Sequence, residues 1–269
     1  MKFFGIEVTR VIGIDDTIQF DGELPHSKER LRDLADIQLA LAAVAVKARV
    51  NAGKYMPPTQ CYHFFNRPDS YDNAGRRLGR TSASRGVTSN GRTIVLESPY
   101  HPTDTHGTTH ETIHNISQRF AHTTGRRRVL STVSRGLNEA GTELLAYDVA
   151  RRLNRLDYEV AYPSLVVIAD QLLPEMAVRS RSQTEGSVRN MLHGDVLTGD
   201  DETLRLMKQT HGREAVELWA GLNDYDSVEN PAGHIRIANA LGLTGAAEIL
   251  TELELGLRPP IIAVELPFL

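Results

Sequence analysis

Two histidines four residues apart, His110 and His114, lie in a run that has the pattern of a helix. From Gly107 to Phe120 the chain contains no further glycine and no proline, and apolar residues recur at helical spacing. A helix places His110 and His114 on one face, with Cβ atoms about 5–6 Å apart. A single tetrahedral zinc ion can span that distance, so this segment is predicted to be a helix that presents a pair of metal ligands.

Glu111 follows His110 and completes the pattern His-Glu-x-x-His. One position round the helix, its carboxylate can reach a water molecule beside a metal rather than the metal itself. Glu111 is therefore predicted to act as a general base. The alternative is an amphipathic helix that carries two exposed histidines by chance.

A catalytic zinc site needs a third protein ligand and an open fourth position. The chain has a single cysteine, Cys61, so its metal ligands must be histidines and carboxylates. A second helical pattern begins near Gly136, and Asn138 and Glu139 lie in its first turn.

These two motifs together resemble those of gluzincin-type zinc metallopeptidases, the clan of thermolysin and the zinc aminopeptidases, and its minimal members in particular. The resemblance implies that Glu139 is the third zinc ligand and that Glu111 is the base. It also implies that Glu143, one turn after Glu139, hydrogen-bonds a zinc-bound histidine, with Asn138 beside the site. The 24 residues between His114 and Glu139 exceed the usual gap in the large gluzincins, which leaves Glu143 as an alternative ligand.

Hydrolysis by such a site also needs a hydrogen-bond donor for the developing oxyanion. Tyr147, eight residues after Glu139, and Tyr162, before the following helix, are the two candidates, and either can instead be a packing residue. His106 is expected to be exposed at the start of its helix. The basic residues 126–128 are expected to form an exposed loop.

The resemblance implies an α+β fold, with a zincin-like core of a small mixed β-sheet and the His-Glu-x-x-His helix, followed by a mostly helical C-terminal part. Residue patterns predict a hairpin over 2–20, a long helix up to residue 51, strands at 59–65 and 93–96, and a loop over 77–92. Residues 93–97 take the place of the family's edge strand, which pairs with an extended substrate.

The C-terminal half is expected to be helical at 164–179, where Pro174 should kink or end the helix, and again at 201–222 and 231–253. The whole chain is predicted to be one compact unit. Within it, residues 1–54 form the N-terminal hairpin and helix, 55–180 the catalytic core, and 181–269 a helical subdomain.

The net charge and the hydropathy of the chain limit the classes of binding partner that we expect. A net charge of −4 leaves no basic excess for a phosphate backbone, so no nucleic-acid partner is expected. No stretch approaches 18 uncharged apolar residues and the N-terminus is too short for a signal-peptide core, so we expect no membrane segment and a cytoplasmic protein.

The sequence therefore predicts an enzyme with a Zn²⁺ cofactor that hydrolyses peptide bonds in a peptide or protein substrate. The alternative is a zincin-shaped regulatory or protein-binding module without catalysis, whose metal is structural or absent. A glutamate at position 111 favours the enzyme, because a purely structural zinc site has four closed ligands and no use for a base.

Overall fold

The computed structural model describes the backbone of residues 2–3, 6–7, 21, 23–24, 28–52, 61–65, 67–77, 86–89, 92–97, 105–156, 158, 160–222 and 230–261. Side chains are described for most of the helical residues and for none of those in strands. Residues 4–5 and 8–20 of the predicted hairpin and residues 59–60 of the predicted strand lie outside the described part.

The chain divides into two compact units. The first comprises Met1–Thr124 and Val149–Arg155, and the second comprises Gly125–Asp148 and Leu156–Leu269. Helix α6 (Arg135–Arg152) contributes residues to both. The predicted boundaries at 54/55 and 180/181 stay predictions.

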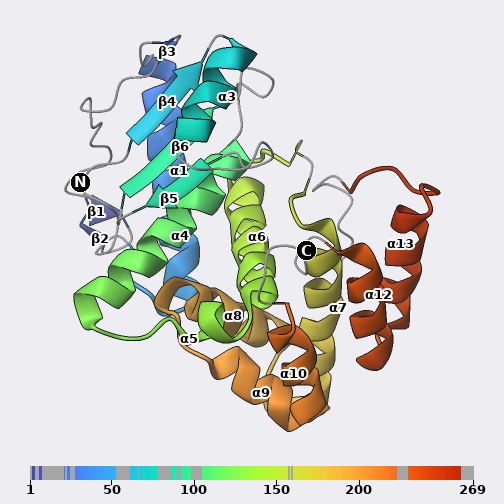
Figure 1. The fold of residues 1–269 in the computed structure, drawn as a ribbon. Coiled ribbons are helices and arrows are strands. Elements are labelled where there is room, and N and C mark those ends of the chain that lie inside the picture. The colour runs from blue at the N-terminus through green and yellow to red at the C-terminus, as the bar shows by residue number, and fades with distance from the viewer. Residues whose placement is uncertain are drawn as a thin grey trace. The chain divides into compact units, whose positions relative to one another are not determined.

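The first unit contains helices α1 (Lys28–Lys47), α3 (Pro68–Arg77) and α4 (Thr105–Thr124), and short strands. The strands are β1 (Lys2–Phe3), β2 (Ile6–Glu7), β3 (Glu23–Leu24), β4 (Cys61–Phe65), β5 (Gly86–Ser89) and β6 (Arg92–Glu97). Strands β1 and β2 form an antiparallel pair, and the other four pair in the order β3-β4-β6-β5, with β4 and β6 parallel. Helix α4 packs against β5, β6 and α1 (Figure 1). The long N-terminal helix and the His-Glu-x-x-His helix are thus confirmed.

The expected α+β fold class is wrong. Where side chains as well as backbone are described, the protein is all-helical, with 77% of residues in helices and no strands. The strands are short segments of backbone in the first unit, and most of the chain after residue 104 is helix. In the part of the chain with described side chains, apolar faces of helices pack against one another and form the core.

The expected substrate-binding edge at residues 93–97 is also wrong, because β6 lies between β4 and β5. Both sides of β6 are already paired. Ile94 of β6 aligns with Cys61 of β4 on one side and with Val87 of β5 on the other. Residues 86–89, which lie in the predicted loop 77–92, form strand β5 instead. Their sequence has a weak strand propensity, and pairing with β6 stabilises the strand.

The second unit is built around helix α7 (Pro163–Ser180), which packs against several of the helices that follow it (Figure 1). Its residues 165–170 are all buried, the pattern of a helix surrounded by protein. The other helices are α5 (Val129–Val133), α8 (Glu185–Thr198), α9 (Glu202–His211), α10 (Arg213–Ala220), α12 (Pro231–Ala240) and α13 (Thr244–Glu254).

Helix α7 confirms the helix predicted over 164–179, and it continues through Pro174 to Ser180 instead of ending there. Buried residues on both sides of the proline offset its cost of about 3 kcal/mol. Two other predictions for this unit are wrong. The predicted helices 201–222 and 231–253 are each two helices. They are divided at Gly212 and Gly242, whose φ values of 86° and 73° lie in a region that L residues rarely adopt.

Helix α6 is fixed at its N-terminus by a serine. The Ser134 hydroxyl accepts a hydrogen bond from the Leu137 N–H at 3.1 Å and donates one to the Trp219 carbonyl at 2.8 Å. Farther along, a Cβ at Gly141 would lie 2.6 Å from Val196 Cγ2 and 3.0 Å from Leu192 Cδ1 of α8. The absence of a side chain at Gly141 therefore sets how closely α6 and α8 pack.

A largely buried ionic cluster, with Asp148 and Arg189 half-buried, joins α6, α7 and α8. Arg189 Nε donates to Asp148 Oδ2 at 3.2 Å, and its Nη1 lies 3.7 Å from Asp170 Oδ1. The fully buried His193 has its Nδ1 3.8 Å from the same Asp148 oxygen. Burial raises the pKa of the Asp170 carboxyl to about 6, and Arg189 limits that rise. A single arginine thus ties the three helices together.

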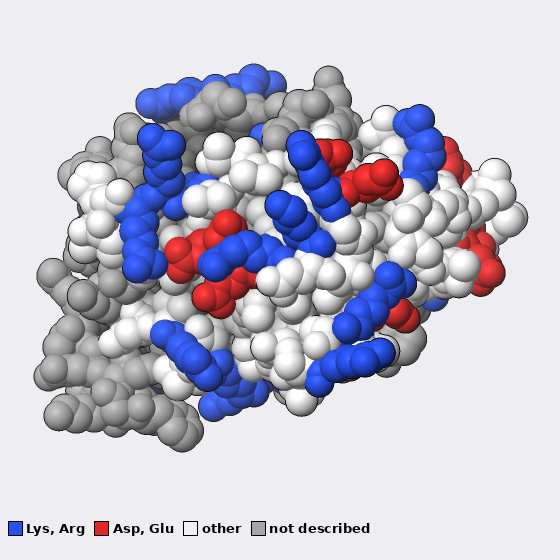
Figure 2. All heavy atoms as spheres, turned by 90° about the horizontal axis from the view of Figure 1, so that it is seen from below, with Lys and Arg blue, Asp and Glu red and all other residues white. Residues whose placement is uncertain are grey.

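Charged side chains of both signs are interspersed on the face shown in Figure 2, where acidic groups lie between Lys and Arg. Among the described residues, no helix combines the length and the apolar character needed to cross a membrane.

The close approach of α6 to α8 predicts that Gly141→Ala lowers the free energy of unfolding by about 1–3 kcal/mol, because the added methyl overpacks Val196 and Leu192. Gly186→Ala on α8 is the matched control, since a Cβ there meets nothing within 4 Å, and it should leave stability unchanged or raise it by less than about 1 kcal/mol. Urea unfolding of both variants measures this. Equal stability of the two would show that the contact is not tight.

Candidate metal centre

The two histidines of the motif point their rings at each other on α4. His110 Nε2 and His114 Nε2 lie 2.9 Å apart, and the ring centroids are 4.6 Å apart with the planes at 78°. His110 is buried and His114 is half-buried. The four-residue spacing thus brings one nitrogen from each ring to the same point, as the helix geometry predicts.

Glu139 on α6 completes the group. One ligand atom from each of His110, His114 and Glu139 lies within 4.8 Å of the other two. The Glu139 side chain is only 8% exposed. The sequence prediction that these three residues share one place is confirmed, and the group could hold a metal ion.

The donor set fits a divalent transition metal. Two imidazole nitrogens on one tetrahedral zinc, each about 2.0–2.1 Å from the ion, lie about 3.3 Å apart, so the 2.9 Å separation needs to open by only a few tenths of an ångström. Two imidazoles and one carboxylate are a ligand set that zinc accepts, whereas magnesium and calcium prefer oxygen ligands. The chemistry of the donors therefore favours a transition metal.

The other predicted site residues lie on the same two helices, with one exception. Glu111, next to His110 on α4, is half-buried. Asn138, Glu143 and Tyr147 are buried on α6, with exposed fractions of 4%, 2% and 4%. Burial alone does not test what these four residues do, so their roles in catalysis and in metal binding stay predictions.

Tyr162 is the exception, because it precedes α7. It is half-buried and has φ 50° and ψ 48°, a left-handed conformation that a tyrosine adopts only where its surroundings hold it. Pro163 follows at the first helical position, and its fixed φ suits the start of the helix. The role of Tyr162 as an oxyanion donor also stays a prediction.

The expectation that His106 is exposed is wrong. Its exposed fraction is 3%, and its ring centroid lies 6.3 Å from that of His110. Residues 106–110 are all buried, so the first turn of α4 is not a solvent-facing end.

Arginine side chains neighbour the Glu139 carboxylate. Arg135 lies one helical turn earlier, with its Nε 3.8 Å from Glu139 Oε1. Burial lowers the pKa of the Arg128 guanidinium, and the negative charge of Glu139 opposes that shift. Two cationic groups thus act on the carboxylate of the site.

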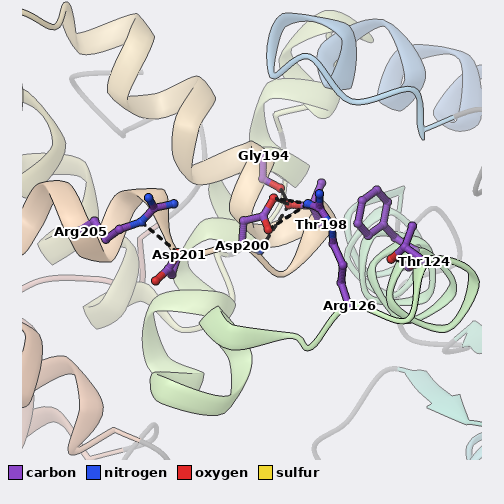
Figure 3. Close-up of polar contacts among 8 residues, drawn as sticks. Thr124, Arg126, Gly194, Thr198, Asp200, Asp201 and Arg205 are labelled. Atoms are coloured by element: carbon purple, nitrogen blue, oxygen red, sulfur yellow. Dashed lines mark hydrogen bonds and ion pairs between the residues drawn. The ribbon is translucent and has the colours of Figure 1, made fainter.

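Contacts with the end of α8 position the segment that carries Arg128. The Arg126 guanidinium donates to Asp200 Oδ1 at 3.3 Å, and Thr198 Oγ1 donates to Asp200 Oδ2 at 2.9 Å (Figure 3). The Gly199 carbonyl accepts from the Val129 N–H at 2.7 Å. The predicted exposed loop 126–128 is therefore exposed at its first two residues, whereas Arg128 is half-buried.

Neither Arg128 nor Arg135 was predicted as part of the site. The spacing of Arg135 could have indicated its position, because residues at i and i+4 lie on the same face of a helix. Glu139, four residues later, was already a candidate ligand. The position of Arg128 depends on packing against α8, which no local pattern indicates.

Comparisons with protein-family models, curated proteins and solved structures gave no match for this chain.

The group predicts different metal affinities for variants of the two glutamates on α6. Glu139→Gln should weaken zinc binding by more than about 100-fold, because a ligand oxygen loses its charge. Glu143→Gln should weaken it by about 10–100-fold at most, the typical range for a residue that acts through a ligand. Titration of each variant against a chromophoric chelator measures the affinities, and circular dichroism checks the fold. The reverse order would make Glu143 the ligand.

Proposed function

We propose that this chain is a zinc-dependent peptidase of the gluzincin type, with His110, His114 and Glu139 as the metal ligands. The observation that carries the proposal is the grouping of these side chains within 4.8 Å. Two of them come from the His-Glu-x-x-His motif on α4, and the third comes from the Asn-Glu motif on α6. The order of motifs and the ligand types are those that the resemblance to gluzincins requires.

The number of ligands supports catalysis over a structural role. Within the part of the chain that the structure describes, His, Cys, Asp and Glu side chains group closely enough for an ion only at these three residues. Structural zinc sites are closed by four protein ligands, whereas catalytic sites keep a position for water. A zinc ion held there supplies a Lewis acid that lowers the pKa of water toward 7 and polarises the substrate carbonyl.

Glu111 is proposed to move the proton in this reaction. It neighbours His110 on the helix and is half-buried, whereas His110 is buried. Its carboxylate takes a proton from the attacking water and delivers it to the leaving amine, so one residue serves both half-reactions.

Tyr162 or Tyr147 is proposed to donate a hydrogen bond to the oxyanion. Tyr162 is the more exposed of the two, and Tyr147 is 4% exposed. A donor has to reach a substrate that arrives from solvent, and this requirement favours Tyr162. A peptide or protein stays the proposed substrate, and the absence of nucleic-acid and membrane partners stays a prediction.

A second candidate function is a regulatory or protein-binding module without catalysis. The observation in its favour is the ion pair between Arg135 and Glu139, which compensates the buried carboxylate without a metal. The two functions differ in what Glu111 does, since only a peptidase needs its proton transfer.

Glu111→Gln should keep zinc bound and the fold intact while slowing peptide hydrolysis by at least about 100-fold, because Gln has the same shape and cannot accept the proton. Glu217→Gln, an exposed change on α10, is the control and should cleave like the parent. Mass spectrometry of a peptide mixture incubated with each zinc-loaded protein measures the rates. Undiminished cleavage by Glu111→Gln would exclude Glu111 as the base, and a parent that binds zinc and cleaves nothing would favour the module.

A further inference from the structure

Arg135 and Glu139 form an ion pair of unequal burial on helix α6. Arg135 Nε lies 3.8 Å from Glu139 Oε1, with side-chain exposures of 37% for the arginine and 8% for the glutamate. This distance is too long for a hydrogen bond between the two atoms, so this contact contributes charge rather than fixed orientation. The nearly buried partner is the carboxylate that the candidate metal centre needs.

A nearby cation compensates the burial of a carboxylate. Transfer of an ionised group from water into a protein interior is strongly unfavourable unless an opposite charge compensates it. Arg135 supplies that charge from the same helix, and Arg128 adds a second positive charge that the Glu139 carboxylate senses. The chain therefore carries the charge compensation for Glu139 in its own sequence.

A divalent ion and a guanidinium that share one carboxylate repel each other. At an effective dielectric constant near 20, charges of +2 and +1 a few ångströms apart interact more strongly than a single pair of unit charges. The partial exposure of Arg135 screens this repulsion but does not remove it. Binding of a metal by Glu139 thus weakens the hold of Arg135 on the same group.

We propose that Arg135 is the counter-ion of Glu139 in the metal-free protein and that it competes with the metal for this carboxylate. Arg135 acts through Glu139 and is a positioning residue that lowers metal affinity while stabilising the metal-free site. The inference rests on the proposed metal binding by His110, His114 and Glu139, and it does not depend on hydrolysis.

The test is the zinc affinity of the full chain with Arg135→Gln, measured by competition with a chromophoric chelator. Zinc should bind about tenfold tighter than to the parent, because the competing charge is gone. Arg135→Lys keeps the charge and should bind like the parent. The matched control is Arg213→Gln on α10, which removes the arginine from another i,i+4 pair with a glutamate, Glu217, and should leave the affinity unchanged.

If Arg135 had only a structural role, its replacement would lower the zinc affinity or leave it unchanged. A higher zinc affinity of Arg135→Gln therefore indicates that Arg135 competes with the metal. If circular dichroism shows that Arg135→Gln does not fold, Arg135→Met keeps the aliphatic stem and replaces it in the same titration. Zinc binding to the parent with equal or weaker binding to the charge-removing variant would overturn this inference and leave the metal centre intact. No zinc binding to the parent would overturn the metal centre itself.

Discussion

The burial of the Glu139 carboxylate is the constraint on which the chemistry of this protein depends. Burial of an ionised carboxylate is unfavourable unless opposite charges or hydrogen bonds compensate it, and the Glu139 side chain is only 8% exposed. Two imidazole nitrogens converge within 4.8 Å of it, and two arginines contribute positive charge. The same carboxylate can thus be compensated by an arginine or by a metal, and the proposed functions differ in which of them dominates.

The position of Glu139 depends in turn on how α6 is held in the second unit. Ser134 caps the helix, Gly141 lets it approach α8, and Arg189 binds the Asp148 carboxylate near its other end. These contacts restrain α6 along its length. A ligand carried by such a helix keeps its geometry without a metal, and this preorganisation favours selective binding.

The parts of the site that were predictable from sequence are those that a single helix determines. The spacing of His110 and His114 fixes their proximity, and a resemblance of motifs supplied Glu139. The same local rule would have indicated Arg135. Helices α1, α4 and α6 were predictable for the same reason, because apolar periodicity along one segment determines each of them.

The incorrect predictions concern properties that depend on residues far apart in the sequence. The position of β6 between two neighbours follows from pairing with β5, a segment whose Gly and Ser residues predict a loop. The burial of His106 depends on the packing of α4 against other parts of the chain. The all-helical character of the part with described side chains likewise reflects packing between helices rather than any one motif.

The most direct test of the metal centre is anomalous diffraction at the zinc edge from crystals of the zinc-loaded protein. We expect one anomalous peak about 2.0–2.2 Å from a nitrogen of His110, a nitrogen of His114 and a carboxylate oxygen of Glu139. A peak bonded to other residues, or no peak at His110 and His114 in fully zinc-loaded crystals, would contradict the account.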